Sequence, residues 1–269
     1  MGFSAEGPVK ADEAWIAAPK ARLFVRSWTP VMAAPGKAPI VLFHDSLGCT
    51  GLWRDFPAAL AARTGRQVLA YDRWGFGRSD TRAGGLAPDF VADEARSFFP
   101  ALRAHWGLGR FVAFGHSVGG GMAVHCAAAF AGDCVALVTE SAQAMVEERT
   151  LQGIREAKAW FQDEQQVERL RKYHGDKARW VLDAWTETWL APPFASWSLA
   201  SVLPAVRCPL LAIHGAQDEY GSVAQPQMIA DLSAGPSQLA IMDDTFHVPH
   251  RERADAVLEL MAGFLAPIE

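Results

Sequence analysis

The segment FVAFGHSVGGGMAVHCAAAFAG, residues 111–132, decides the fold prediction because its character changes at a single serine. An apolar run with β-branched and aromatic residues precedes Ser117 and predicts a strand, whereas the Ala-rich run after it predicts a helix. Gly115 and Gly119 flank the serine, which is typical of a turn too tight for side chains at those positions. The pattern G-x-S-x-G between a strand and a helix is a nucleophile elbow, so Ser117 is a candidate catalytic nucleophile.

Apolar runs alternate with helix-length segments on both sides of this motif. Strands are predicted at 22–28, 38–45, 66–72, 110–117, 135–141, 209–213 and 237–244, and helices at 53–64, 88–107, 118–132, 224–234 and 251–266. Strands this apolar are covered by helices on both faces. The sequence therefore predicts an α/β fold with a mostly parallel central sheet flanked by helices.

The alternation stops between residues 143 and 202, where only helical patterns occur. That span also carries five of the ten tryptophans, at positions 160, 180, 185, 189 and 197. A helical insertion at this place in an α/β chain is typical of a lid over the sheet edge where ligands bind. We therefore predict a core formed by residues 1–142 and 203–269, and a helical lid formed by residues 143–202.

Composition limits the partners and the location that we expect. The 269 residues carry a formal net charge of −5 and no Lys/Arg cluster, which argues against nucleic acid or an anionic membrane as a partner. No apolar run is long enough to span a bilayer, and the first 18 residues lack the pattern of a signal peptide. The four cysteines show no CxxC pair, which suits a reducing compartment. We expect a cytoplasmic monomer or homodimer that acts on a small molecule.

Two further residues occupy the positions expected for partners of the serine. Asp218 follows the strand predicted at 209–213, and His247 follows the last predicted strand. The order Ser, acid, His, with each residue at a strand end, is that of a catalytic triad in this kind of sheet. Asp218 is expected to orient the imidazole, and His247 to take the proton of Ser117 and return it to the leaving group.

Competing assignments exist for both partners. Glu140 ends the strand after the elbow and could supply the acid in place of Asp218, whereas His250 is a weaker candidate for the base because it lies closer to the terminal helix. A metal site is not expected, because no pair among His44, His214 and His247 combines zinc-ligand spacing with an open third ligand.

The stretch VLFHDSLGCTGLW, residues 41–53, resembles an oxyanion loop of the type H-G-x-x-G. By position, the backbone N–H groups of Ser46 and Val118 are expected to form the oxyanion hole. Asp45 occupies the place where glycine is usual, and a carboxylate there would oppose an oxyanion unless it pointed away or was paired with an arginine. We favour a structural aspartate whose carboxylate bonds the amides of its own turn.

With these residues in hand, the chain resembles the α/β-hydrolase fold family from about Arg22 to its end. The stretch YDRWGFGRSD, residues 71–80, is similar to the family's D-x-R-G-x-G-x-S loop, and the predicted lid lies at the family's usual insertion point. The resemblance implies a serine hydrolase that works through an acyl-enzyme without metal or organic cofactor. A serine at position 117 argues against dehalogenase and epoxide hydrolase relatives, which use aspartate there.

The resemblance leaves the substrate open, because one triad serves several reactions. We expect a hydrolase of an apolar carboxylic ester, with His116, Trp185 and Trp189 as substrate-binding residues. A hydrolase of carbon–carbon bonds in ring-cleavage products and a cofactor-free perhydrolase are alternatives among enzymes. A ligand-binding protein on a hydrolase scaffold is the alternative from another class.

Overall fold

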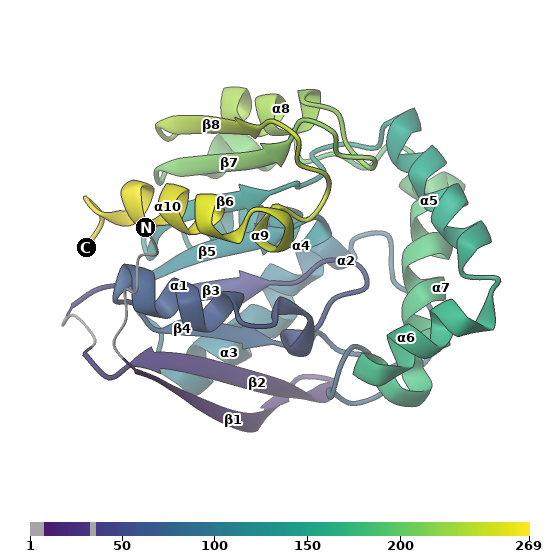
Figure 1. Ribbon diagram of the computed structural model, residues 1–269, viewed down its shortest axis with the longest axis horizontal. Coiled ribbons are helices and arrows are strands. Elements are labelled where there is room, and N and C mark those ends of the chain that lie inside the picture. The colour runs from purple at the N-terminus through teal and green to yellow at the C-terminus, as the bar shows by residue number, and fades with distance from the viewer. Residues whose placement is uncertain (1–7, 33–35) are drawn as a thin grey trace.

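The computed structural model describes residues 8–32 and 36–269 (Figure 1). The first seven residues of the stretch in which no signal peptide is expected lie outside this part of the chain. Within the described residues, no helix combines the length and the apolar character needed to cross a membrane.

An eight-stranded sheet forms the centre of the molecule, in the order β1-β2-β4-β3-β5-β6-β7-β8 (Figure 1). The strands are β1 (Val9–Ala18), β2 (Ala21–Pro30), β3 (Ile40–Phe43), β4 (Val68–Tyr71), β5 (Phe111–His116), β6 (Cys134–Glu140), β7 (Leu210–Gly215) and β8 (Ser237–Met242). Strands β3 to β8 pair in parallel, and β1 and β2 are antiparallel. The predicted α/β fold with a mostly parallel sheet is confirmed.

Strand β1 is the one strand among the described residues that the sequence did not predict. It lies at the sheet edge, and most of its side chains are exposed. An edge strand needs few apolar side chains, because one flank of its backbone and much of its surface meet water. Its sequence, VKADEAWIAA, therefore lacks the apolar run on which the other strands were recognised.

Helices cover both faces of the sheet. They are α1 (Phe56–Thr64), α2 (Phe90–Asp93), α3 (Phe99–Trp106), α4 (Val118–Ala129), α5 (Glu148–Trp160), α6 (Glu164–His174), α7 (Ala178–Trp189), α8 (Ala224–Leu232), α9 (Pro249–Glu252) and α10 (Ala254–Leu265). Side chains of α1 and α10 form the apolar layer on one face, and side chains of α2, α3, α4 and α8 contribute to the layer on the other. The single helix predicted at 88–107 is interrupted by a π-helical turn, Glu94–Phe98, just before Pro100.

Successive residues of the central strands supply these two layers in turn. In β3, Leu42 belongs to one apolar cluster and Phe43 to the other, and both side chains are fully buried. The same alternation occurs in β5 between Ala113 and Phe114. Because side chains on a strand point to opposite faces in turn, a strand buried on both faces is apolar throughout.

Helices α5, α6 and α7 of the predicted lid lie beyond the carboxyl ends of the parallel strands (Figure 1). They have an apolar cluster of their own, which includes Phe161, Val167 and Val181 and packs around Phe76 from the core. Helix α5 also contacts the loop after β7, where Thr150 donates a hydrogen bond to the carbonyl of Tyr220 (2.6 Å). This placement brings the helical segment 143–202 over the edge at which the predicted site residues lie.

The loop at residues 71–80 is held by the carboxylate of Asp72. Its Oδ1 accepts the N–H of Thr50 (2.6 Å) from the loop after β3, and its Oδ2 accepts the N–H of Arg78 (2.7 Å). Gly77 has a φ of 48°, and a Cβ on it would lie 2.0 Å from Asp72 Oδ2. The buried aspartate therefore joins two loops at the carboxyl edge of the sheet, and glycine at 77 leaves room for it.

Candidate active site

Ser117 lies between β5 and α4 in a strained turn. Its backbone has a φ of 55°, in the left-handed region that disfavours residues other than glycine. A Cβ on Gly115 would lie 2.1 Å from the carbonyl oxygen of Gly119, and a Cβ on Gly119 would lie 2.2 Å from that of Phe43. The two glycines of the motif are thus required by close backbone contacts, and the tight turn presents the serine hydroxyl at the carboxyl edge of the sheet.

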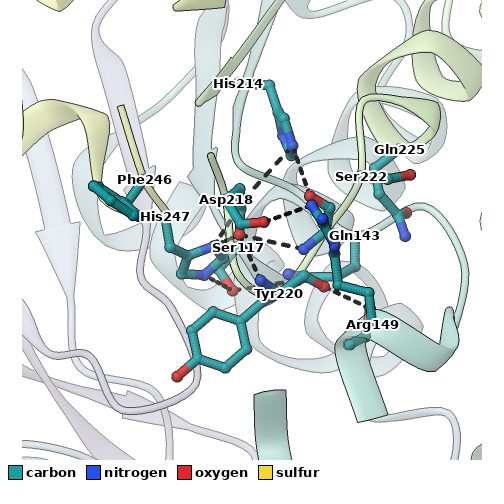
Figure 2. A network of polar contacts seen from close by, with 12 residues as sticks. Ser117, Gln143, Arg149, His214, Asp218, Tyr220, Ser222, Gln225, Phe246 and His247 are labelled. Carbon is teal, nitrogen blue, oxygen red and sulfur yellow. Dashed lines mark hydrogen bonds and ion pairs between the residues drawn. The ribbon is translucent and has the colours of Figure 1, made fainter. Parts of the chain in front are cut away.

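The three residues predicted to form a triad lie within hydrogen-bond distance of one another (Figure 2). His247 Nδ1 is 2.9 Å from each carboxylate oxygen of Asp218, and His247 Nε2 is 3.1 Å from the hydroxyl oxygen of Ser117. All three residues are buried. With the Nδ1 proton donated to the carboxylate, Nε2 is left to accept the proton of the serine hydroxyl.

The surroundings of the pair keep Asp218 charged. Burial by itself disfavours a carboxylate, but the charge and the hydrogen bond of His247 lower the pKa of Asp218 below its usual value. The N–H groups of Tyr220 (2.7 Å) and Gly221 (3.2 Å) also donate to its Oδ1. Burial likewise disfavours imidazolium at His247, yet the charge and the hydrogen bond of Asp218 raise the pKa of His247 above its usual value.

Gln143 is a contact of Ser117 that the sequence did not identify. The hydroxyl of Ser117 lies 3.2 Å from Gln143 Oε1, to which it can donate a hydrogen bond when it does not donate to His247 (Figure 2). Gln143 was placed only as the first residue of the predicted lid. Its role follows from the fold, because the chain leaves β6 next to the elbow and no local motif marks it.

A cavity of about 220 Å³ opens beside Ser117 and His247. Its other lining residues come from the loops after β3, β6, β7 and β8 and from α5 and α7: Asp45, Ser46, Leu47, Gln143, Thr150, Ile154, Trp185, Trp189, Glu219, Tyr220 and Val248. Trp185 and Trp189, predicted as substrate-binding, both line it. Glu219 and Tyr220, next to Asp218 in the chain, were missed because they belong to no motif.

His116 is not placed as expected. Its ring is buried, it does not line the cavity beside Ser117, and its Nε2 donates a hydrogen bond to the backbone carbonyl of His247 (2.8 Å). Burial lowers the pKa of His116 to about 4, so the ring is neutral at neutral pH. We correct its assignment from a substrate contact to a support for the backbone of His247, because a side chain before the elbow turns away from the side to which Ser117 points.

Glu140 and His250, the competing acid and base, pair with each other. His250 Nδ1 lies 2.5 Å from Glu140 Oε2, and among the described residues neither side chain has a hydrogen bond with Ser117 or His247. Together with His116 they form a buried group whose potential metal-ligand atoms lie within 4.8 Å of one another. A metal there would have to replace the bond between Glu140 and His250 and the bond of His116 to its carbonyl partner.

The loop after β3 brings Ser46 to the wall of the cavity. Val118 is the first residue of α4, and its N–H has no carbonyl one helical turn earlier to bond. These are the two residues from which the sequence predicts the oxyanion donors. Both belong to segments that meet at Ser117.

The expectation for Asp45 is wrong. Its backbone carbonyl, not its carboxylate, bonds the turn: it accepts the N–H of Gly48 (3.2 Å) and the guanidinium of Arg73 (2.7 Å). No described residue donates a hydrogen bond to the carboxylate, which lies over Gly48, where a Cβ would be 1.9 Å from Oδ1. The carboxylate is therefore half-buried at the cavity wall without a partner in the described chain.

Several solved structures share the fold of this chain. The 2-hydroxy-6-oxo-6-phenylhexa-2,4-dienoate hydrolase of Rhodococcus sp. strain RHA1 matches with a TM-score of 0.81 and 16% identity over 96% of this chain and 100% of that chain. A proline iminopeptidase of Mycobacterium smegmatis matches with a TM-score of 0.73 and 21% identity over 95% and 98% of the two chains. An enol-lactonase of Burkholderia xenovorans LB400 matches with a TM-score of 0.71 and 22% identity over 94% and 100%. At such identities the likeness shows the fold alone.

The sequence itself carries the family assignment. A search of curated protein sequences finds no significant match. The family model described as the alpha/beta hydrolase fold matches residues 38–176, more than half of the chain. The matched region contains the loop after β3, the 71–80 loop and the elbow at Ser117. The chain therefore belongs to the α/β-hydrolase fold family.

Proposed function

We propose that this protein is a serine hydrolase that cleaves a carboxylic ester through Ser117, His247 and Asp218. One observation carries the proposal: a single imidazole bridges a buried carboxylate and a serine hydroxyl at the wall of a cavity. This is the geometry of an activated nucleophile whose base is oriented by a third group.

Acylation begins when a substrate carbonyl occupies the cavity next to Ser117. His247 Nε2 takes the hydroxyl proton as the serine oxygen forms a bond to the carbonyl carbon. Asp218 holds the imidazole in the required tautomer and stabilises the imidazolium, without taking the proton itself. The imidazolium then returns the proton to the leaving alcohol, and an acyl-enzyme remains on Ser117.

Deacylation repeats these steps with water as the nucleophile, and releases the acid. In both halves the negative charge on the carbonyl oxygen needs donors. We assign the N–H groups of Val118 and Ser46 to this role, because the first lies at the start of a helix next to the nucleophile and the second at the cavity wall. Every step uses side chains and backbone of this chain and needs neither a metal nor an organic cofactor.

The charge of the cavity favours an ester over a ring-cleavage product. The solved neighbour from Rhodococcus is named as the hydrolase of a dienoate, which is a carboxylate anion. Among the described residues that line the cavity of this chain, none is lysine or arginine. A buried carboxylate without a cationic partner binds poorly. The carbon–carbon hydrolase therefore remains the second candidate.

The helical segment 143–202 is assigned as the lid of this site. Trp185 and Trp189 of α7 and Ile154 of α5 supply apolar surface to the cavity. An apolar acyl or alcohol group of small to medium size would bury its surface against them.

A labelling experiment tests the nucleophile. A fluorophosphonate probe is expected to modify the wild-type chain and to leave Ser117→Ala unmodified. Absence of labelling at pH 8 would contradict an activated serine and favour a ligand-binding protein on this scaffold.

A substrate screen tests the reaction. p-Nitrophenyl esters of increasing chain length are compared with a ring-cleavage dienoate on the same enzyme preparation. We expect turnover of the esters that depends on Ser117. Faster turnover of the dienoate than of every ester would make the carbon–carbon hydrolase the better assignment.

A further inference from the structure

The cavity beside Ser117 has an unbalanced charge. Two carboxylates line it: Asp45 is half-buried in the loop after β3, and Glu219 is more exposed in the loop after β7. Neither has an ion pair or a side-chain hydrogen bond with any residue in the described ranges 8–32 and 36–269. The cavity wall thus carries two negative charges and, in that part of the chain, no lysine or arginine.

Two arginines contact the backbone of residues at or next to this wall. Arg73 donates to the backbone carbonyl of Asp45 (2.7 Å) and packs over the ring of Phe76, with 4.0 Å between guanidinium carbon and ring centre. Arg149 donates to the backbone carbonyl of Asp218 (3.0 Å; Figure 2). Neither guanidinium lines the cavity. They moderate the negative field from behind the wall and leave both carboxylates free to face a ligand.

Aromatic side chains also line this cavity. Trp185 of α7 and Tyr220 of the loop after β7 meet edge to face, with ring centroids 5.8 Å apart, and both line the cavity and are only partly buried. Tyr220 also lies against the imidazole of His247, with ring centroids 4.7 Å apart. Aromatic faces attract cations through the negative potential of the ring, and more strongly where water is displaced.

We propose that the preferred substrate of this site is an ester that carries a fixed positive charge, an ammonium group held between the carboxylates of Asp45 and Glu219 and the rings of Trp185 and Tyr220. The proposal rests on the proposed function, because it names the substrate class of the same site. Carboxylates supply attraction over several ångströms in a partly desolvated cavity, and the aromatic rings supply a surface that accepts an alkylated cation without hydrogen bonds.

A cationic substrate also accounts for the unusual residue in the oxyanion loop. A carboxylate at position 45 opposes the negative charge that forms on the substrate carbonyl. An ammonium group beside Asp45 offsets that opposition in the transition state. An uncharged ester would leave the carboxylate with only the partial compensation of Arg73 behind the wall, and an anionic ester would add a further repulsion.

Two pairs of isosteric esters test the charge. Butyrylcholine is compared with 3,3-dimethylbutyl butyrate, in which carbon replaces the charged nitrogen of the alcohol. The p-nitrophenyl ester of trimethylglycine is compared with that of 3,3-dimethylbutyrate, in which carbon replaces the charged nitrogen of the acyl group. We expect kcat/KM to favour the cation by ~10-fold or more in at least one pair, and that pair identifies which side of the ester carries the charge.

Variants separate the charge effect from differences in intrinsic reactivity. Asp45→Asn and Glu219→Gln should each lower the cation-to-neutral ratio of kcat/KM by ~3- to 10-fold, at an effective dielectric typical of partly exposed sites. Asp183→Asn is the matched control: Asp183 is an exposed acid on α7 that does not line this cavity, so its removal should leave the ratio unchanged. Raising the ionic strength should shrink the preference in the wild type.

Binding to Ser117→Ala, which cannot turn over, keeps the two proposals distinguishable. Calorimetric titration of that variant should show butyrylcholine or the trimethylglycine ester binding more tightly than its neutral isostere. A ratio of kcat/KM at or below one in both pairs, or a ratio that neither Asp45→Asn nor Glu219→Gln changes, would overturn the cationic substrate. Ser117-dependent turnover of neutral p-nitrophenyl esters in that same preparation would leave the proposed function standing. Charge-selective binding without any turnover would instead contradict the hydrolase.

Discussion

Two histidine–carboxylate pairs lie at the ends of neighbouring strands in this molecule. Asp218 follows β7 and pairs with His247, at 2.9 Å, whereas Glu140 ends β6 and pairs with His250 of α9, at 2.5 Å. All four residues are buried. By residue type, burial and distance, either pair could be the acid and base of a triad.

The two pairs differ in what each imidazole contacts besides its carboxylate. His247 Nε2 faces the hydroxyl of Ser117 and the cavity. The ring of His250 packs against the rings of Trp53 and His116, with centroids 4.7 and 5.0 Å away. A buried histidine–carboxylate pair is therefore a structural unit that becomes catalytic only where a nucleophile and space for a substrate meet it.

Removing the nucleophile should give the largest effect. Ser117→Ala leaves both pairs in place and is expected to lower kcat for ester hydrolysis by ~10⁶-fold, because no acyl-enzyme can form. The melting temperature should change little, since the hydroxyl contributes one hydrogen bond in the folded state. Residual turnover near the wild-type rate would mean that Ser117 is not the nucleophile.

Replacing each carboxylate by the corresponding amide tests the comparison of the two pairs directly. Asp218→Asn should lower kcat by ~10⁴-fold, because the amide no longer holds the imidazole in the tautomer that accepts the serine proton. Glu140→Gln should act on stability, with a loss of ~3 kcal/mol in the free energy of unfolding, because it breaks a buried pair. Its kcat per folded molecule should stay within a few-fold of the wild type.

Both variants are measured by steady-state kinetics and by urea unfolding under one set of conditions. Parallel loss of activity in the two variants would mean that the pairs act as one network through His116. A larger loss of kcat in Glu140→Gln than in Asp218→Asn would reverse the assignment of the acid.

Removing an aromatic side chain from the cavity wall should have a moderate effect on KM. Trp185→Ala should raise KM for long-chain esters more than for acetates, because an apolar contact is lost. The difference should correspond to ~1–3 kcal/mol of apparent binding free energy. Trp160→Ala is the control, since Trp160 is 53% exposed on α5 and does not line the cavity. An equal change in KM for acetate and long-chain esters would show that Trp185 does not contact the substrate chain.

The dependence of activity on pH should show a smaller effect, whose direction follows from the pKa of His247. Asp218 raises the pKa of His247, so the neutral base forms only as pH rises past the usual value of 6.5. We expect kcat/KM to increase with pH with a midpoint above 6.5, and that midpoint to move down in Asp218→Asn. A wild-type profile flat from pH 5 to 9 would exclude a histidine base from the slow step.

Stability should depend on pH with opposite signs at His247 and Glu140, one residue from each pair. The raised pKa of His247 stabilises the fold below the unfolded pKa, and this contribution is lost as pH rises through the folded pKa. The lowered pKa of Glu140, where burial opposes ionisation but the charge of His250 outweighs it, stabilises the fold above the unfolded value of 4.5. That contribution is lost as pH falls through the folded pKa. Asp218, whose pKa is also lowered, adds to the acid-side dependence and remains in Glu140→Gln. Thermal melts of Glu140→Gln should therefore show a weaker acid-side dependence than the wild type, and an unchanged acid limb would contradict this.

The sequence by itself determined the features that rest on local sterics and strand order. Gly115 is required by a backbone contact within its own turn and Gly119 by the close approach of the end of β3, but the motif that both belong to is visible in five residues. Asp218 and His247 each follow a parallel strand, and the carboxyl ends of parallel strands meet at one edge of the sheet. The α/β fold, the elbow and the three residues of the hydrogen-bonded triad could therefore all be predicted from the sequence.

Only the tertiary structure decided which polar groups meet and which charges remain unpaired. Nothing local distinguishes Glu140 with His250 from Asp218 with His247, because the pairing depends on how β6 and α9 pack. The orientation of His116, the contact of Gln143 with Ser117 and the free carboxylate of Asp45 likewise arise between segments distant in the chain. Patterns of residue type describe what a segment can bury. Which neighbour satisfies a buried polar group is decided by the packing of the whole chain.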